Sequence, residues 1–260
     1  MQFTLKVVDA TGAVRAARSG EEETFLVHRA EYAPGDVLTV EADGPRHIVL
    51  SLDGGMAPAL VYLTGPFALP VPFGERKKTY PPNAFSGSLN RLTVRAAHPE
   101  EIAARRNLAF NPWDDHANAT LFPHGSANVE TRGEAVFAAR NAIDGEIAND
   151  DHGFWPYTSW GINRDPEAAL TIAFGRPVRV DEVAVRLRAD FPHDAWWERA
   201  MLDFSDGSQE ALNFVKTGAT QRFRIAPRVI DSARLHSLIK ADDPSPFPAL
   251  TQIEFRGTEA

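Results

Sequence analysis

The apolar residues of this chain occur in short runs, and turn-forming residues separate one run from the next. In the first run Phe3, Leu5 and Val7 alternate with polar residues, which places their side chains on one face of an extended strand. Turn signals between the first runs are Pro34-Gly35-Asp36, Asp43-Gly44-Pro45 and Asp53-Gly54-Gly55. Short strands at this spacing are typical of an antiparallel β-sandwich. We find no helical pattern between the runs, which a doubly wound parallel sheet would require.

The expected strands form two groups with a helical pattern between them. Those of the first group span residues 3–8, 24–28, 37–41, 47–52, 59–63 and 89–95. Those of the second span 137–143, 169–174, 178–187, 201–204, 211–214, 221–225, 234–240 and 250–255. Pro99, the acids after it and two final arginines favour a helix over 99–106. We therefore predict an all-β protein. It has an N-terminal β-sandwich domain at 1–98, a helical linker or junction at 99–118, and a C-terminal β-sandwich domain at 119–260.

Charge and cysteine content exclude several classes of function. The formal net charge is -8, and an acidic chain is poorly suited to nucleic acid. There is no cysteine, which excludes disulfides, zinc fingers, iron–sulfur clusters and thiol catalysis. The first residues lack the basic and apolar regions of an export signal, and no run reaches the roughly 20 apolar residues of a membrane span. We therefore expect a soluble, cytoplasmic protein with no nucleic-acid partner.

Six short motifs in the second half follow one another in the order of one fold family. They are Asn141-Ala142-Ile143-Asp144-Gly145, Thr158-Ser159-Trp160-Gly161, residues 170–175, residues 178–183, Leu202-Asp203-Phe204-Ser205-Asp206-Gly207 and Gln252-Ile253-Glu254-Phe255-Arg256-Gly257. On these motifs, residues 107–257 resemble the galactose-binding-like jelly roll, which includes discoidin or coagulation-factor type C domains and family 32 carbohydrate-binding modules. The resemblance implies that loops at one end of the sandwich bind glycans, typically through Arg, His, Asn and aromatic side chains.

The resemblance also bears on metal binding at Asp144. In many relatives the Asp-Gly loop holds a structural calcium ion, largely through backbone carbonyl groups, so the resemblance makes Asp144 the candidate ligand. Gln252 stands in place of the first acid of the terminal motif and removes one carboxylate, which leaves Glu254 as a further acid near the loop. The alternative is that Asp144 belongs to a solvated acidic loop without an ion. We expect no other cofactor.

Four of the five tryptophans lie in or beside predicted loops of the second half, next to charged side chains. The candidate ligand-binding residues are Trp155, Arg188, Asp190, His193, Trp196 and Trp197. An indole packs on the apolar face of a sugar ring, while charged and imidazole groups hydrogen-bond its hydroxyls. Tryptophan is also a common core residue, and we expect that role first for Trp160. Trp196 and Trp197 would point opposite ways on a strand, so at most one faces a site. Arg188 and Asp190 could also pair with each other.

We therefore predict a non-catalytic protein that binds an oligosaccharide through the loops of the C-terminal jelly roll. The first alternative is a sugar-active enzyme, a hydrolase or lyase, with its site in the cleft between the domains. Glycoside hydrolysis uses two carboxylates that flank the bond, and Asp114, Asp115 and Glu75 are the candidates. The second alternative is a protein-interaction module. The basic run Arg76-Lys77-Lys78 would suit an acidic sugar or the carboxylates of a partner, or is only solvated.

Overall fold

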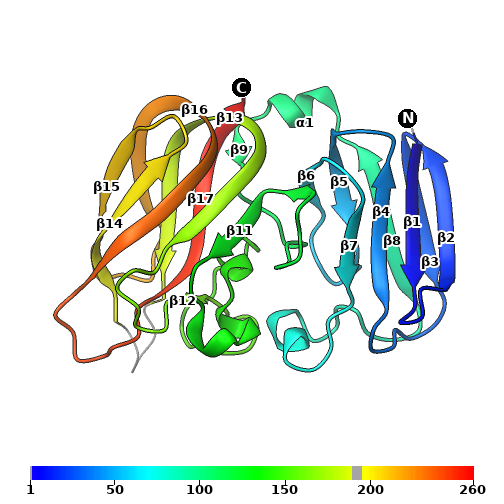
Figure 1. The fold of residues 1–260 in the computed structure, drawn as a ribbon, viewed down its shortest axis with the longest axis horizontal. Coiled ribbons are helices and arrows are strands. Elements are labelled where there is room, and N and C mark those ends of the chain that lie inside the picture. The colour runs from blue at the N-terminus through cyan, green and yellow to red at the C-terminus, as the bar shows by residue number, and fades with distance from the viewer. Residues whose placement is uncertain (1, 189–194) are drawn as a thin grey trace.

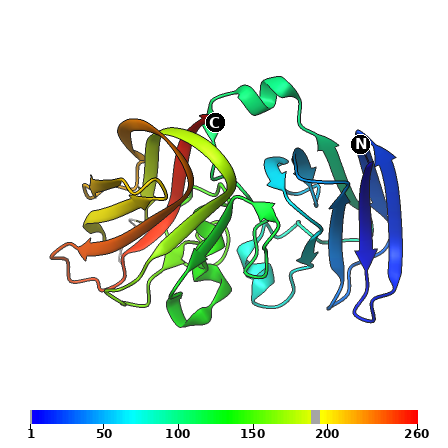
Figure 2. The same cartoon turned by 45° about the horizontal axis from the view of Figure 1, so that its top comes forward.

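The computed structural model describes residues 2–188 and 195–260 and confirms the prediction of an all-β protein. The chain forms two β-rich halves that lie side by side, and the short helix α1 (Pro99–Ala103) lies on the connection between them (Figure 1). The two halves are also distinct in the rotated view, where α1 lies at the top of the junction between them (Figure 2). No helix within these described ranges is long and apolar enough to cross a membrane.

The N-terminal half is a sandwich of two antiparallel sheets. One sheet has the strand order β2 (Val14–Glu21), β1 (Gln2–Val8), β4 (Val37–Ala42) and β7 (Phe67–Pro70). The other has the order β10 (Leu121–Phe122), β6 (Ala59–Leu63), β5 (Arg46–Ser51), β8 (Asn90–Ala96) and β3 (Glu23–His28). Phe3, Leu5 and Val7 are fully buried, as their alternation predicts, and they share one core with Leu50 of the second sheet. The 3-10 helix η1 (Arg76–Thr79) lies between β7 and β8.

The C-terminal half is an antiparallel sheet whose longest strands curve. Its order is β12 (Trp160–Gly161), β17 (Ala249–Glu259), β13 (Leu170–Leu187), β16 (Gln221–Lys240), β14 (Trp197–Phe204) and β15 (Gln209–Asn213), while β11 (His124–Ala127) pairs with β13 and β9 (Arg106–Asn107) with β17. The register between β13 and β16 shifts between Ala173 and Val178, and both long ribbons are curved (Figure 2). The curved sheet encloses a core that includes Trp160, Phe174 and Trp197.

The segment after α1, in and beyond the linker or junction predicted over 99–118, packs into both halves. Strand β9 pairs with β17 of the C-terminal half, whereas β10 pairs with β6 of the N-terminal half. Between them, Trp113 is fully buried in the N-terminal core, and its indole N–H donates to the carbonyl oxygen of Leu50 at 3.0 Å. The chain then returns to the C-terminal half in β11. Buried contacts therefore join the two halves, in addition to α1.

Two local predictions are corrected by the structure. The strand predicted at 137–143 is wrong, because the chain there forms the 3-10 helices η3 (Ala135–Phe137) and η4 (Ala139–Ala142), preceded by η2 (Thr131–Gly133). The Asn141 side chain favours these turns, since its nitrogen donates to the backbone carbonyl oxygens of Ala135 and Ser159. The predicted helix also ends early, at Ala103 rather than at the arginines.

Candidate functional sites

A pocket of about 250 Å³ opens at one end of the C-terminal half, and we call it the loop-end pocket. Its lining includes Arg132, His152, Asn163, Arg164, Arg188 and Phe247. These residues come from η2, from the loops before and after β12, and from the segments that follow β13 and precede β17. Strand β12 lies at the end of the half that is away from the C-terminus (Figure 1). This volume lies just below the usual range for ligand sites, which is about 300–1,000 Å³.

Close packing between η2 and β12 shapes the loop-end pocket. A Cβ atom at Gly161 would lie 2.6 Å from the hydroxyl oxygen of Thr131, so glycine alone fits at this point. The same oxygen accepts a hydrogen bond from the backbone N–H of Asn163 at 2.9 Å. Asn163 and Arg164 adopt left-handed backbone conformations, with φ of 50° and 60°. Asparagine tolerates this conformation, whereas it costs about 1–2 kcal/mol in arginine, so the turn is strained at Arg164. Strain of this kind clusters at ligand sites.

The side chains of the loop-end pocket combine aromatic rings with guanidinium groups. The Phe247 side chain is 43% exposed, and the guanidinium of Arg164 lies 5.7 Å from the centre of its ring. Arg188 is buried, and its Nη2 donates to the carbonyl oxygen of Phe247 at 2.9 Å, which holds the segment before β17 in place. The guanidinium of Arg132 lies 5.5 Å from the centre of the Phe137 ring. The pocket thus presents apolar surface with hydrogen-bond donors beside it.

The structure separates the residues that the sequence predicts for ligand binding. Arg188 lines the loop-end pocket, whereas Trp155 lines a different pocket between the two halves. Trp197 is fully buried in the C-terminal core, so this conformation leaves it no ring face for a ligand and corrects that part of the prediction. Trp196 is half-buried and packs against the same core. The remaining two candidates, Asp190 and His193, lie outside the described residues.

The exposed aromatic ring of the loop-end pocket comes from Phe247, which the sequence-based prediction missed. A signal was present, because Phe247 stands between Pro246 and Pro248, and proline favours turns over regular strands. Nothing in the local spacing links this residue to Arg164, because the two meet only through the fold. Trp160 has the structural role expected of it. It is fully buried, and its indole N–H donates to the carbonyl oxygen of Val129 at 3.0 Å.

A second pocket, of about 220 Å³, lies between the two halves, and we call it the interdomain pocket. Its lining includes Met56 and Thr79 from the N-terminal half, Phe110 from the joining segment, and Arg140, Asp144 and Trp155 from the C-terminal half. Trp155 is half-buried. Its backbone N–H donates to the carbonyl oxygen of Lys78 at 2.8 Å, so a loop of one half is fixed to η1 of the other.

Arg140 and Asp144 bring opposite charges to the interdomain pocket without direct contact. The Nε of Arg140 donates to the carbonyl oxygen of Asp114 at 2.8 Å, and its Nη2 donates to that of Pro112 at 2.9 Å. Its Nη1 donates to the side-chain oxygen of Asn141 at 3.1 Å. No hydrogen bond or ion pair joins Arg140 to Asp144 in the part of the chain that the structure describes. The two groups therefore face the pocket as a separated donor and acceptor.

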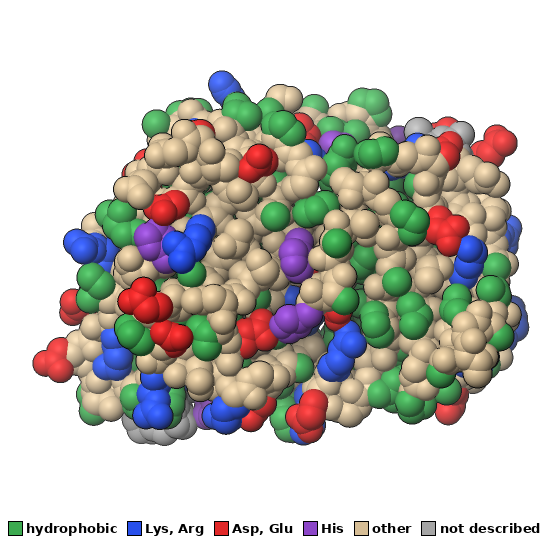
Figure 3. Space-filling view, viewed as in Figure 1, with side chains coloured by type: hydrophobic (Ala, Val, Ile, Leu, Met, Phe, Trp, Pro, Cys, Tyr) green, Lys and Arg blue, Asp and Glu red, His purple; other side chains and the backbone are tan. Residues whose placement is uncertain are grey.

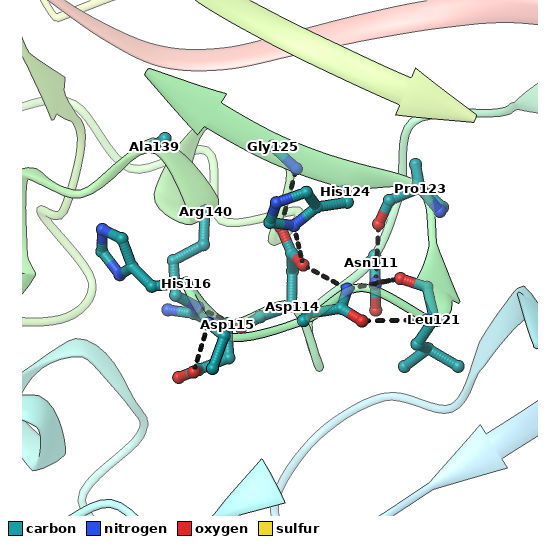
Figure 4. Close-up of polar contacts among 12 residues, drawn as sticks. Asn111, Asp114, Asp115, His116, Leu121, Pro123, His124, Gly125, Ala139 and Arg140 are labelled. Atoms are coloured by element: carbon teal, nitrogen blue, oxygen red, sulfur yellow. Dashed lines mark hydrogen bonds and ion pairs between the residues drawn. The ribbon is translucent and has the colours of Figure 1, made fainter. Parts of the chain in front are cut away.

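Next to Arg140, a buried acid holds a histidine at the junction of the halves (Figure 4). The Asp114 carboxylate is sealed from solvent and lies 2.8 Å from Nδ1 of His124. It also accepts hydrogen bonds from the Asn118 side-chain nitrogen at 2.7 Å and from the backbone N–H of Gly125 at 2.8 Å. The hydrogen bond to Asp114 raises the pKa of His124, because the carboxylate stabilises the charged ring. Figure 3 shows histidine, acidic and basic side chains on the face of the molecule that Figure 1 presents.

The other charged residues selected from the sequence make intramolecular contacts. Asp115 is ion-paired with Arg76, and Glu75 accepts from Nζ of Lys78 at 2.6 Å. Lys77 turns inward, where its ammonium group donates to a backbone carbonyl oxygen. The basic run at 76–78 is therefore engaged within the chain. Across residues 2–188 and 195–260, no group of three or more histidine or acidic side chains could hold a metal ion.

The loop that the family resemblance links to calcium does not fit an ion, because a buried amide closes it. The Nε2 of Gln252 donates to the carbonyl oxygen of Asn141 at 2.5 Å and to Oδ1 of Asp144 at 2.7 Å. Its Oε1 accepts from the backbone N–H of Gly145 at 3.0 Å. Calcium needs a shell of oxygens, and here N–H donors already point at two of them. Burial raises the pKa of Asp144 to about 7, so this carboxyl is only partly ionised at neutral pH.

No protein-family model matches the sequence, and no curated protein matches it. Similar solved structures include chitosan-binding module 1 derived from chitosanase/glucanase from Paenibacillus sp. IK-5, which is 19% identical, with a TM-score of 0.39, over 58% of this chain and 99% of that one. The family 32 CBM from C. perfringens NanJ in complex with galactose is 16% identical over 51% of this chain and 91% of that one, with a TM-score of 0.39.

The lectin domain of Lectinolysin complexed with Lewis B antigen is also similar, at 14% identity over 60% of this chain and 98% of that one, with a TM-score of 0.44. By their printed descriptions, these structures are carbohydrate-binding and lectin modules. At such identities and TM-scores, the ligand of this chain has to be argued from its own residues.

Proposed function

We propose that this chain binds carbohydrate without transforming it and that the loop-end pocket is the binding site. The exposed ring of Phe247, in a concave site that also contains Arg164 and Arg188, is the observation that supports this proposal. The C–H face of a sugar ring packs on an aromatic ring, and guanidinium N–H groups donate to sugar oxygens. The pocket offers both kinds of contact side by side.

The geometry of the loop-end pocket suits one sugar unit, such as the end of an oligosaccharide. Its volume of about 250 Å³ leaves little room for a chain of sugars. Arg164 has no acidic partner within the described ranges, which leaves its N–H groups to a ligand. One ring face and a few hydrogen bonds supply limited binding free energy, so we expect a dissociation constant of about 0.1–1 mM for a monosaccharide.

Calorimetric titration of the full chain with a panel of mono- and oligosaccharides tests the proposal. Phe247→Ala and Arg164→Ala should each weaken binding about tenfold, which corresponds to about 1.4 kcal/mol. Phe73→Ala is the matched control, because Phe73 is a phenylalanine of the N-terminal half with a similar exposure, 38%. It should bind as the unchanged protein does. If Phe247→Ala and Arg164→Ala both bind sugar as tightly as Phe73→Ala and the unchanged protein do, the loop-end pocket is not the site.

The alternative of a sugar hydrolase receives no support from the acids selected for it. The carboxylate of Asp114 is sealed and hydrogen-bonded, and those of Asp115 and Glu75 are paired with cations. Catalysis by flanking carboxylates needs two such groups open to the substrate. An oligosaccharide that binds the protein should accordingly be recovered intact after incubation with it. Release of smaller sugars would favour the enzyme.

A further inference from the structure

The interdomain pocket shares no lining residue with the loop-end pocket, and the proposed function does not use it. Much of its lining is apolar, with contributions from Met56, Phe110, Pro112 and Trp155. Charged side chains enter this apolar lining at Arg140, Asp144 and Glu146. An apolar cavity with a few placed polar groups is the usual form of a small-ligand site.

Arg140 brings an incompletely used donor to this pocket. The residue is only 6% exposed, and a guanidinium has five N–H groups. The described hydrogen bonds account for the Nε hydrogen, both Nη1 hydrogens and one Nη2 hydrogen. Every acceptor is an uncharged oxygen, so no carboxylate touches this buried cation within the described ranges. The guanidinium lies 4.6 Å from the centre of the Tyr80 ring, and a ligand oxygen at the remaining Nη2 N–H would satisfy its last donor.

Asp144 brings the matching acceptor. Its Oδ1 accepts hydrogen bonds from Gln252 Nε2 and from the backbone N–H of Glu146. Its Oδ2 accepts none from any residue that the structure describes. The Asp144 carboxyl and the Arg140 guanidinium attract each other electrostatically but stay beyond hydrogen-bond distance. A ligand group between them could accept from one and donate to the other.

The opposite charges also determine which ligands are disfavoured. An anion attracted by Arg140 meets Glu146 and the partly ionised Asp144, and a cation attracted by these acids meets Arg140. A neutral group that both accepts and donates avoids the two repulsions, and a secondary amide does so across a short span. A hydroxyl group has the same hydrogen-bonding ability but lacks an apolar part for the surrounding wall. An acetamido group has one, in its methyl.

We propose that the interdomain pocket binds the acetamido group of an N-acetylated amino sugar. Its carbonyl oxygen accepts from Arg140, its N–H donates to Asp144, its methyl group packs on Met56 and Phe110, and the sugar ring lies against Trp155. The ligand class, carbohydrate, rests on the proposed function, but the site is separate from the loop-end pocket. Both halves of the protein line this site, so the N-terminal half has a binding role here rather than only a supporting one.

Titration of the Phe247→Ala variant of this chain with N-acetylglucosamine favours this site, because that substitution weakens the loop-end pocket about tenfold. Glucosamine and glucose are the matched probes, since one carries an ammonium group and the other a hydroxyl in place of the acetamido group. We expect N-acetylglucosamine to bind at least about tenfold more tightly than either. Adding Trp155→Ala should weaken its binding at least about tenfold, whereas Trp155→Phe, which keeps an aromatic ring, should retain most of it.

Phe154→Ala is the control for Trp155→Ala, because Phe154 is the exposed neighbour and does not line the pocket. It should leave binding unchanged, and a thermal scan should show every variant folded. Unchanged binding in Trp155→Ala, or glucose bound as tightly as N-acetylglucosamine, would overturn the inference. If the single variant Phe247→Ala binds no sugar at all while the unsubstituted protein does, the proposed function stands and this second site is rejected. An unsubstituted protein that binds no sugar would reject both.

Discussion

Changing the amide of Gln252 to a carboxylate should make the loop at 141–145 respond to calcium. In Gln252→Glu, the N–H donors to the Asn141 carbonyl oxygen and to Oδ1 of Asp144 are lost. The bond from the backbone N–H of Gly145 survives, because a carboxylate keeps an acceptor oxygen. Two carboxyl groups and a carbonyl oxygen then face a common centre. Oxygen ligands of this kind are those that calcium prefers.

The cost of this substitution without calcium follows from the lost contacts. Two hydrogen bonds contribute about 1 kcal/mol each. Two carboxylates about 4 Å apart repel each other by about 4 kcal/mol at an effective dielectric constant of about 20. Proton uptake by the pair relieves part of this repulsion, so we expect a loss of about 3–5 kcal/mol at pH 8. In a chain of this size, the melting temperature then falls by roughly 10 °C.

Thermal unfolding in calcium and in chelator measures the effect. The native protein should melt at one temperature in both solutions, because its loop is closed by an amide. Gln252→Glu should recover in calcium, by about 2.7 kcal/mol when the ion is at about 100 times its dissociation constant. The control Gln252→Ala should be destabilised equally in both. A native protein that melts earlier in chelator would refute the reasoning, since an ion would then be holding the loop.

Two further predictions concern the packing and the titration of single groups. Gly161→Ala should lower the free energy of unfolding by about 1–3 kcal/mol, because its Cβ would lie 2.6 Å from the Thr131 hydroxyl oxygen; an unchanged denaturation midpoint would contradict this contact. Burial raises the pKa of Asp144 to about 7, so its contribution to stability is full below about pH 4 and is lost as the pH rises to about 7. Asp144→Asn keeps the acceptor oxygen and should flatten this decline in urea denaturation between pH 5 and 8, and an unaltered pH profile would contradict it.

The strand pattern was predictable wherever one face of a strand meets a core. Phe3, Leu5 and Val7 alternate with polar residues because their strand has a solvated face, and the structure buries all three. The same reasoning failed at 137–143, where turns rather than a strand bury the apolar residues. The segment 137–143 has three alanines where 3–8 has valine, leucine and threonine, and its Asn141 amide satisfies the backbone of the turns. That interaction depends on residue 159, which no local pattern reveals.

The candidate site was less predictable, because tertiary packing decides what an aromatic residue does. Trp113 and Trp197 are both fully buried, yet they stand beside charged residues in the sequence as a ligand-binding tryptophan would. Conversely, the exposed ring at the loop-end pocket belongs to a phenylalanine. Arg188 was predicted and does line that pocket. Its neighbours there come from segments that are far apart in the chain, so no spacing in the sequence could bring them together.

The two pockets differ in how the chain builds them, and this difference bears on what each half contributes. The loop-end pocket is made wholly from the C-terminal half. The interdomain pocket depends on the segment that begins at β9, because Trp113 is buried in the N-terminal core and the next residue, Asp114, holds Arg140 through its backbone carbonyl oxygen. The position of Arg140 is therefore tied to a side chain of the opposite half. Because Arg140 is held in this way, the interdomain pocket forms only when the two halves pack together, and both halves supply its lining.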